Sequence, residues 1–143
     1  MIDRLQEKDI DQVAQIEAEI FSVPWSIKSF KDALASEQNI YLKAETDGQI
    51  VGYCGIWTSF ESADLCNIAV KKEFRKAGLG QKLLEAGIQE AAARGVERIL
   101  LEVSQSNKAA KRLYEKNRLQ TNGLRKSYTK KTVEKAILME RFY

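Results

Sequence analysis

Between a predicted strand and a long predicted helix lies the basic loop Lys71-Lys72-Glu73-Phe74-Arg75-Lys76-Ala77-Gly78-Leu79-Gly80. Its glycines let backbone N–H groups approach a ligand closely, and the first N–H groups of a helix have no partner within that helix. The flanking Lys and Arg residues add positive charge. These features predict a phosphate site, although a flexible basic turn with a glycine helix start explains the local pattern equally well. The loop is not a Walker A loop, because no Gly-Lys-Ser/Thr sequence follows the glycines.

A dinucleotide-binding turn is a second interpretation of these glycines, because Glu102 stands at the next predicted strand, about twenty residues downstream. Two features argue against it. Leu83 occupies the position of the third glycine, and the whole segment 71–77 separates strand from helix where the dinucleotide turn is tight. We therefore reject this interpretation.

On the N-terminal side of the loop, hydrophobic periodicity predicts two helices and an antiparallel meander. Asp47-Gly48 is a strong hairpin signal, because both residues tolerate positive φ. A short turn around Phe60 and Glu61 precedes a third strand. The expected elements are a helix over 9–21 with Asp9 available as its cap, a short helix from Ser26 through about Ala35, and strands over 40–45, 49–58 and 63–70.

On the C-terminal side, the pattern predicts helix, strand, helix, strand and strand. The expected elements are a helix over 78–94 ending at Gly95, a strand over 98–103, a helix capped by Ser106 or Asn107 with Ala109, Ala110, Leu113 and Tyr114 on one face, and strands over 119–128 and 136–142. The fold class is therefore α/β, with a mixed sheet covered on both faces. A single proline, Pro24, and the absence of repeats predict one domain over 1–143.

Composition excludes several chemistries. The chain of 143 residues has no histidine, which removes Ser-His and Cys-His nucleophiles and imidazole metal sites, so we expect no metal. Cys54 and Cys66 are too far apart for a CxxC motif, and we expect free thiols packed nearly opposite each other as small core residues. With no apolar run long enough to cross a bilayer and no secretory leader, we expect a cytoplasmic protein.

Charge is distributed unevenly along the chain. Residues 1–103 hold 12 Lys and Arg against 17 Asp and Glu, whereas residues 104–143 hold 11 against 3. The basic C-terminal part is suited to phosphates, either on a cofactor or on RNA. A solvated basic face explains it equally well.

Glu102 and Tyr114 form a second candidate site. Glu102 interrupts an otherwise apolar strand, and Tyr114 lies on the apolar face of the following helix. A carboxylate in such a setting acts as a base and a tyrosine as a proton donor. On the residues alone, an edge-exposed glutamate and a core tyrosine are the commoner outcome.

Several segments resemble one enzyme family. Residues 75–80 (RKAGLG) match the R/Q-x-x-G-x-G/A signature of the GNAT acetyltransferases, and the chain as a whole resembles their ribosomal-protein-alanine N-acetyltransferases. The further matching segments are Phe21-Ser22-Val23-Pro24-Trp25-Ser26, 48–57 (GQIVGYCGIW), Asn67-Ile68-Ala69-Val70, Leu101-Glu102-Val103, Ser106-Asn107, Ala110, Leu113-Tyr114-Glu115-Lys116, Gly123, Arg125, Tyr128 and 136–139 (AILM). The likeness covers nearly the whole chain, and this set is far more specific than the glycine signature alone.

The resemblance implies a fold, a cofactor and site residues. The fold is a sheet of six to seven mostly antiparallel strands with about four helices on both faces, and the co-substrate is acetyl-CoA. By similarity, Glu102 is the general base, and Tyr114 is the general acid and also lies near the cofactor. The implied cofactor-binding residues are Ile68, Ala69 and Val70 at the pantetheine, Arg75, Lys76, Ala77, Gly78, Leu79 and Gly80 at the pyrophosphate, and Asn107. Trp25 and Tyr128 line the acceptor entrance by the same resemblance, or they are ordinary packed aromatics.

The implied reaction is acetylation of a protein N-terminus, with the N-terminal alanine of a small-subunit ribosomal protein as the expected acceptor. The expected partners include neither membrane nor DNA, and any RNA contact is incidental. A lysine, a polyamine or another small amine is the alternative acceptor. An alternative of a different class is a non-catalytic module that binds acetyl-CoA or RNA.

Four positions depart from the family pattern. Ser104 stands where arginine is usual and Asp64 where histidine is common, and both concern the presumed peptide groove. Lys135 replaces a common acidic residue, and Arg118-Leu119 replaces the usual Gly-Phe after the Tyr114 helix. We expect Asn117 to supply the left-handed residue that ends this helix, less well than glycine does.

Overall fold

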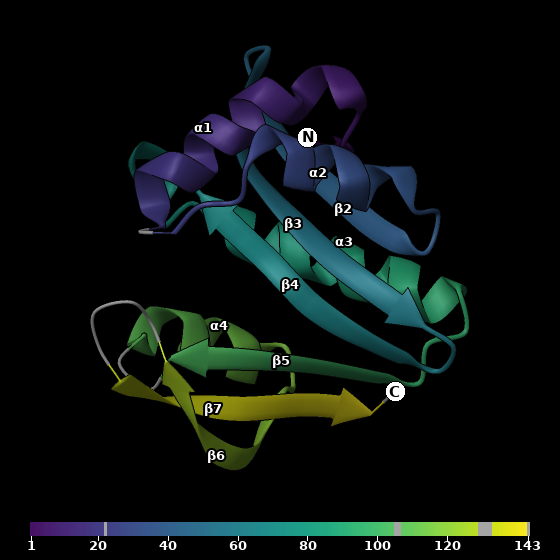
Figure 1. Cartoon of the computed structure of the whole chain (residues 1–143), viewed down its shortest axis with the longest axis vertical. Helices are drawn as coiled ribbons and strands as arrows, with labels where there is room; N and C mark the ends of the chain where they lie inside the picture. Colours follow the sequence, from purple (N-terminus) through teal and green to yellow (C-terminus); the bar gives the residue numbers. More distant parts are fainter. Residues whose placement is uncertain (22, 105–106, 129–132, 143) are drawn as a thin grey trace.

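The computed structural model describes residues 1–21, 23–104, 107–128 and 133–142, without the side chains of residues 104, 122–128, 133–138 and 142. Figure 1 shows the arrangement of its helices and strands. In chain order these are β1 (Ile2–Arg4), the 3-10 helix η1 (Glu7–Asp9), α1 (Ile10–Ile20), α2 (Ile27–Ala35), β2 (Asn39–Thr46), β3 (Gln49–Ser59), β4 (Ser62–Val70), the 3-10 helix η2 (Lys72–Phe74), α3 (Leu79–Ala93), β5 (Arg98–Ser104), α4 (Lys108–Lys116), β6 (Gln120–Tyr128) and β7 (Val133–Phe142).

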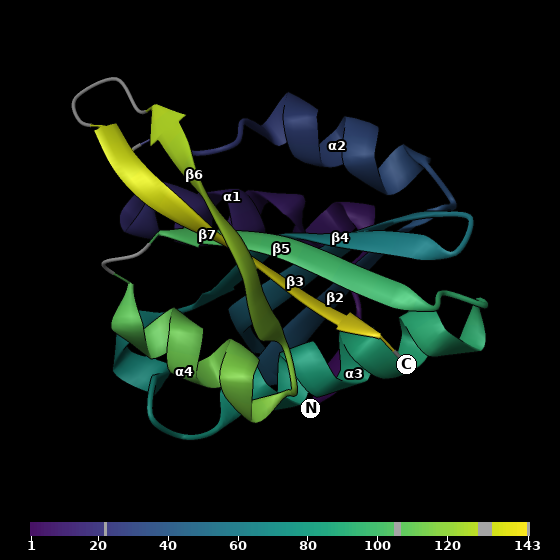
Figure 2. The same cartoon turned by 90° about the horizontal axis from the view of Figure 1, so that it is seen from below.

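Within the described residues, seven strands form one sheet in the order β1-β2-β3-β4-β5-β7-β6. Neighbouring strands are antiparallel except β4 and β5, which run parallel. Helices α1 and α2 cover one face, and α3 and α4 cover the other (Figure 2). The predicted mixed, mostly antiparallel sheet with helices on both faces is confirmed.

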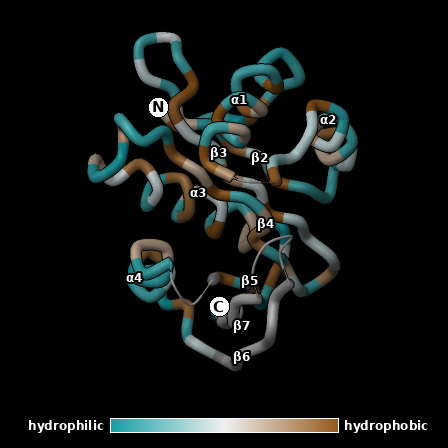
Figure 3. The backbone as a smooth tube through the Cα atoms, turned by 60° about the vertical axis from the view of Figure 1, so that its left-hand side comes forward, coloured by the Kyte–Doolittle hydropathy of each residue, from teal (hydrophilic) through white to brown (hydrophobic). Residues whose placement is uncertain are grey.

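Each face of the sheet has its own apolar core. Under α1 and α2 the cluster includes Ile16, Phe30 and Tyr53. Under α3 and α4 a larger cluster includes Leu83 and Leu101. Figure 3 shows apolar and polar positions alternating along α1 and α3, the pattern of helices with one buried side. Among the described helices, none is long and apolar enough to span a membrane.

The local signals for turns and caps are confirmed at three places. Asp47 and Gly48 both have positive φ, 52° and 76°, in the hairpin between β2 and β3. The Ser26 hydroxyl accepts a hydrogen bond of 3.1 Å from the Ser29 N–H and caps α2. The Asn107 side chain accepts one of 3.1 Å from the Ala110 N–H and caps α4. These bonds occupy backbone donors that a helix start leaves unpaired.

The expected cap role of Asp9 is wrong. Its carboxylate does not cap α1 but accepts hydrogen bonds from the Gln6 N–H at 2.8 Å and the Lys43 ammonium at 2.9 Å. Asp9 and Lys43 are both buried, and the Glu45 carboxylate lies 3.4 Å from the same ammonium. Burial raises the pKa of Asp9, but these hydrogen bonds outweigh it and hold the pKa below its ordinary value. The hydrogen bond to Asp9 raises the pKa of Lys43 despite the opposing effect of burial.

The end of α4 also differs from expectation. Asn117 has φ of −94°, and the left-handed residue is Arg118, with φ of 68°. The Arg118 N–H donates to the Glu115 carbonyl and the Leu119 N–H to the Tyr114 carbonyl, both at 3.0 Å, which is a Schellman motif. Asn117 instead exchanges side-chain hydrogen bonds of 3.0 and 2.7 Å with Gln81 and so ties α4 to α3.

Candidate functional site

The site is organised by the one parallel strand pair. β4 and β5 pair only at their starts, where Ser62, Ala63 and Asp64 lie opposite Arg98, Ile99 and Leu100. Beyond these residues the two strands diverge (Figure 1). Ile68, Ala69 and Val70 therefore lie on the part of β4 that has no partner on the β5 side within the described residues. Unpaired strand backbone offers N–H and C=O groups to a ligand.

A bulge lies at the point where β4 leaves β5. Gly55 of β3 pairs with Asn67 and Ile56 with Leu65, so Cys66 is an extra residue on β4. Cys54 pairs with Ile68 and is buried, whereas Cys66 is exposed. The expectation that the two cysteines pack nearly opposite each other as core residues is therefore wrong for Cys66, because the bulge shifts the register.

Neither thiol is activated as a nucleophile. Burial raises the pKa of Cys54 to about 12, and partial desolvation together with the Asp64 carboxylate raises that of Cys66 to about 11. A thiol with such a pKa is almost entirely protonated at neutral pH. A covalent intermediate on either cysteine is therefore disfavoured.

The basic loop closes the C-terminal end of β4. The Arg75 guanidinium Nε donates to the Val70 carbonyl at 3.0 Å, so the loop is tied back to the strand that it leaves. Lys76 and Gly78 have positive φ, 67° and 79°. Lys76 and Ala77 are exposed and Leu79 is half-buried. The loop thus presents its charge outward at the start of α3.

The N-terminus of α3 has the features of an anion site. Gly78 is its cap residue in the left-handed conformation, no side chain caps the helix, and no acidic residue lies in its first turn. Its first N–H groups and the helix dipole therefore favour a bound anion such as a phosphate.

Gly78 and Gly80 of this loop differ in how strictly each position requires glycine. Gly78 needs its positive φ, whereas a Cβ at Gly80 would meet only the Leu113 side chain at an ordinary 3.6 Å.

Glu102 lies on the opposite face of β5 from the core. Its neighbours Leu101 and Val103 are buried against α3 and α4, and side chains alternate along a strand. Glu102 is exposed accordingly, on the α1 and α2 side of the sheet. Its backbone lies two residues beyond the last pair of β5 with β4.

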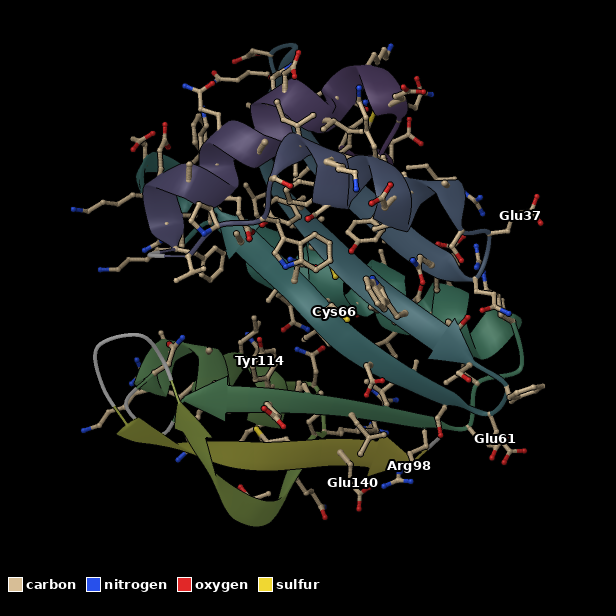
Figure 4. The ribbon with its side chains drawn as sticks, in the orientation of Figure 1. Glu37, Glu61, Cys66, Arg98, Tyr114 and Glu140 are labelled. Carbon is tan, nitrogen blue, oxygen red and sulfur yellow. The ribbon has the colours of Figure 1, made fainter. Side chains whose placement is uncertain are left out.

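Tyr114 approaches from the other face. It is 6% exposed, on α4, and belongs to the same core cluster as Cys54 of β3 and Val103 of β5. In Figure 4 its side chain lies between the ribbons of β4 and β5. Burial raises the pKa of Tyr114 above its ordinary value, and the charge interaction with Cys54 adds a smaller increase. The phenol therefore keeps its proton at neutral pH. Within the described chain its hydroxyl forms no hydrogen bond and is available to a ligand.

The remaining predicted residues come from other parts of the chain. Asn107 is exposed at the start of α4, with its side chain engaged as the cap. Trp25 is half-buried, with its ring 5.9 Å from that of Trp57 between centroids. Asp64 is exposed on β4, opposite Trp57 in the strand register. Tyr128 pairs with Val133 in the β6–β7 hairpin, but its side chain, like those of Ser104 and Lys135, lies outside the described residues.

Sequence reasoning missed a polar network on the α1 and α2 side of the sheet. The buried Glu17 carboxylate accepts hydrogen bonds from the Tyr53 hydroxyl and from the Trp25 N–H, the latter at 2.9 Å. The Tyr41 hydroxyl accepts a hydrogen bond from the Trp57 indole. One signal was available for Glu17, because it falls on the apolar face of α1 beside Val13, Ile16 and Ile20. A carboxylate at such a position requires a buried partner.

These residues bring together three chemical capacities. An anion site lies at the start of α3, an unpaired strand end lies beside it, and a carboxylate and a protonated phenol approach from opposite faces of the sheet. This arrangement suits the transfer of a group from a phosphate-bearing carrier to an acceptor on the α1 and α2 side. Among the described residues, no group of three acidic or cysteine side chains is placed to hold a metal ion.

Comparisons with known proteins agree with this chemistry. The model of the acetyltransferase (GNAT) family matches residues 10–118. A relative from Bacillus subtilis is 39% identical over 133 residues, which are 92% of this chain and 88% of the relative. The [ribosomal protein bS18]-alanine N-acetyltransferase of Salmonella typhimurium is 36% identical over 137 residues, 94% of this chain and 92% of its own. The crystal structure of the ribosomal-protein-S18-alanine N-acetyltransferase from Escherichia coli has a TM-score of 0.89 and 32% identity, covering 98% of this chain and 91% of that one.

Proposed function

Because the chain belongs to the acetyltransferase (GNAT) family, we propose that it transfers the acetyl group of acetyl-CoA to the N-terminal α-amine of a protein. The names of similar proteins support the N-terminal alanine of ribosomal protein S18, a small-subunit protein, as the acceptor. Such an acceptor places the reaction in the cytoplasm, as the sequence predicts. The whole chain, 1–143, forms a single catalytic domain in this proposal.

The residues present fit acetyl-CoA. The uncapped start of α3 and the exposed loop over 75–80 suit the pyrophosphate, since a helix N-terminus without acidic side chains favours an anion. The unpaired end of β4 suits the amide groups of the pantetheine arm. Asn107, whose side chain caps α4, is assigned to the cofactor by the family resemblance. Acetyl-CoA supplies a thioester carbonyl that is open to attack by an amine.

Glu102 acts as the general base in this proposal. An α-amine has an ordinary pKa near ~8, so roughly a tenth of it is neutral at pH 7, whereas a lysine amine with a pKa near ~10.4 is almost entirely protonated. A carboxylate, acting directly or through water, thus needs to remove only one proton from an N-terminus as it attacks. The exposure of Glu102 on the α1 and α2 side of the sheet agrees with an acceptor entering there, and the family resemblance assigns Trp25 and Tyr128 to that entrance.

Tyr114 acts as the general acid. Its buried phenol keeps its proton, and its hydroxyl has no competing hydrogen bond within the described chain. It is therefore suited to protonate a departing thiolate. Backbone N–H groups near Ile68, Ala69 and Val70 are the candidates for stabilising the developing oxyanion. The observation that carries the proposal is the approach of Glu102 and Tyr114 from opposite faces to the site where β4 and β5 part.

The test is Glu102→Gln, which keeps the size and polarity of the side chain but removes its basicity. Turnover with a peptide that begins with alanine should fall by about 10²–10⁴-fold. Acetyl-CoA binding, measured by calorimetry, should be unchanged. If the wild type binds acetyl-CoA but acetylates no amine, the chain is instead a non-catalytic binding module. If it acetylates only lysine or polyamine acceptors, it is an acetyltransferase of side-chain or small-molecule amines.

A further inference from the structure

Three residues in register across the sheet form a contact that sequence patterns do not indicate. Tyr41 of β2 lies opposite Gly55 of β3, and Gly55 lies opposite Asn67 of β4. The Tyr41 hydroxyl donates a hydrogen bond of 3.3 Å to the Asn67 side-chain oxygen, so its side chain spans the intervening strand. A Cβ at Gly55 would overlap the Tyr41 ring, and this glycine therefore makes the crossing possible.

The Asn67 end of this contact lies at the bulge of β4. Asn67 directly follows the extra residue Cys66, and β4 has already lost its β5 partner at this point. The next residues, Ile68 to Val70, are those assigned to the acetyl and pantetheine groups. A strand that is bulged and paired on one side only needs another constraint to keep its backbone in one position.

We propose that Tyr41 is a positioning residue for acetyl transfer, because its hydroxyl fixes the bulged end of β4 through Asn67. This inference rests on the proposed function, since it assigns the β4 backbone to the reacting thioester. Tyr41 itself contacts neither substrate in this account. Its effect on the reaction is exerted entirely through the position of β4.

The hydrogen-bond pattern explains why the hydroxyl matters more than the ring. The oxygen accepts from the Trp57 indole Nε1 at 2.9 Å while it donates to Asn67. Trp57 is 41% exposed and so lies closer to solvent than Asn67 does. Asn67 is only 7% exposed, and a buried amide oxygen without a partner is costly. Asn67 must then rotate or shift to find a new donor, and the bulge shifts with it.

Tyr41→Phe removes the hydroxyl and keeps the ring. We expect kcat with an alanine peptide to fall about tenfold, since a displacement of about 1 Å at a reacting group costs up to 10²-fold. The KM for acetyl-CoA should rise by a smaller factor than kcat falls, because the anion site at α3, which holds the pyrophosphate in this proposal, is untouched. The matched control is Thr58→Val, which removes another hydroxyl from the same sheet, one bonded to the Gln38 carbonyl rather than to β4. Its kcat should remain within about twofold of the wild type.

A second readout does not depend on the acceptor. In hydrogen–deuterium exchange, Tyr41→Phe should accelerate exchange of the amides over 66–70 about tenfold relative to Thr58→Val, with no matching change in α3. Combining Tyr41→Phe with Asn67→Ala should add nothing to the loss that Asn67→Ala causes alone. Unchanged exchange over 66–70, an unchanged kcat, or losses that multiply in the double variant would each overturn the inference. A wild type that is inactive on the alanine peptide would refute the proposed acceptor, while the exchange measurement still decides the role of Tyr41.

Discussion

Replacing Arg118 with glycine should stabilise the protein, although the change removes an entire charged side chain. Arg118 has φ of 68°, and this left-handed conformation costs an ordinary residue roughly 1–2 kcal/mol. Its side chain is exposed, and within the described chain it forms no ion pair or hydrogen bond that the change would break. The two backbone hydrogen bonds of the Schellman motif remain available to glycine.

The magnitude follows from two opposing contributions. Relief of the left-handed conformation contributes about 1–2 kcal/mol, and the greater freedom of glycine in the unfolded chain subtracts roughly 0.5–1 kcal/mol. The net gain is about 1 kcal/mol. A chain of 143 residues has an unfolding entropy of about 0.3 kcal/mol/K, so Tm should rise by about 3 °C.

The assay is thermal and urea unfolding of Arg118→Gly beside Arg118→Ala. Both variants lose the arginine charge at the end of α4, but alanine retains the Cβ and therefore the strain. Arg118→Ala should be no more stable than the wild type. If the two variants unfold at the same temperature, or if alanine is the more stable, the left-handed strain assigned to Arg118 does not exist in solution.

Three further predictions concern other parts of the account. Lys43→Met leaves the buried Asp9 carboxylate unpaired and should lower the free energy of unfolding by about 3–5 kcal/mol in urea titrations, whereas a change below about 1 kcal/mol would contradict the pairing. Because folding lowers the pKa of Asp9, the ionised carboxylate stabilises the fold fully above about pH 4, and this stabilisation is lost as the pH falls further. Urea unfolding at graded pH measures the loss, and a free energy of unfolding that stays constant down to about pH 2 would contradict the lowered pKa. Gly78→Ala should weaken acetyl-CoA binding about tenfold in calorimetry through its positive φ, while equal affinity would remove the α3 N-terminus from the site.

Much of the fold could be predicted from local signals. The Asp47-Gly48 hairpin, the Ser26 cap and the amphipathic spacing of α3 each act within a few residues, and each lies where the pattern predicts. The short strand β1 was missed, because three residues carry no periodicity and the strand depends on its pairing with β2. The 3-10 helix over Glu7–Asp9 was missed because Asp9 bonds to the distant Lys43 instead of capping α1.

The site was only partly accessible from sequence. The basic loop and its glycines indicated an anion site, and Glu102 was a candidate because it interrupts an otherwise apolar strand. The bulge at Cys66 and the divergence of β4 from β5 were not predictable, because both arise from the pairing of strands that are distant in sequence. The contact from Tyr41 to Asn67 has the same origin, since it depends on the register of three strands.

The central claim is that this chain acetylates a free protein N-terminus. The most direct measurement incubates the protein and acetyl-CoA with two peptides, one with a free N-terminal alanine and no lysine, the other blocked at its N-terminus with an internal lysine. Mass spectrometry then locates the acetyl group. The account predicts modification of the free alanine alone. Modification of the lysine alone, or of neither peptide, would contradict it.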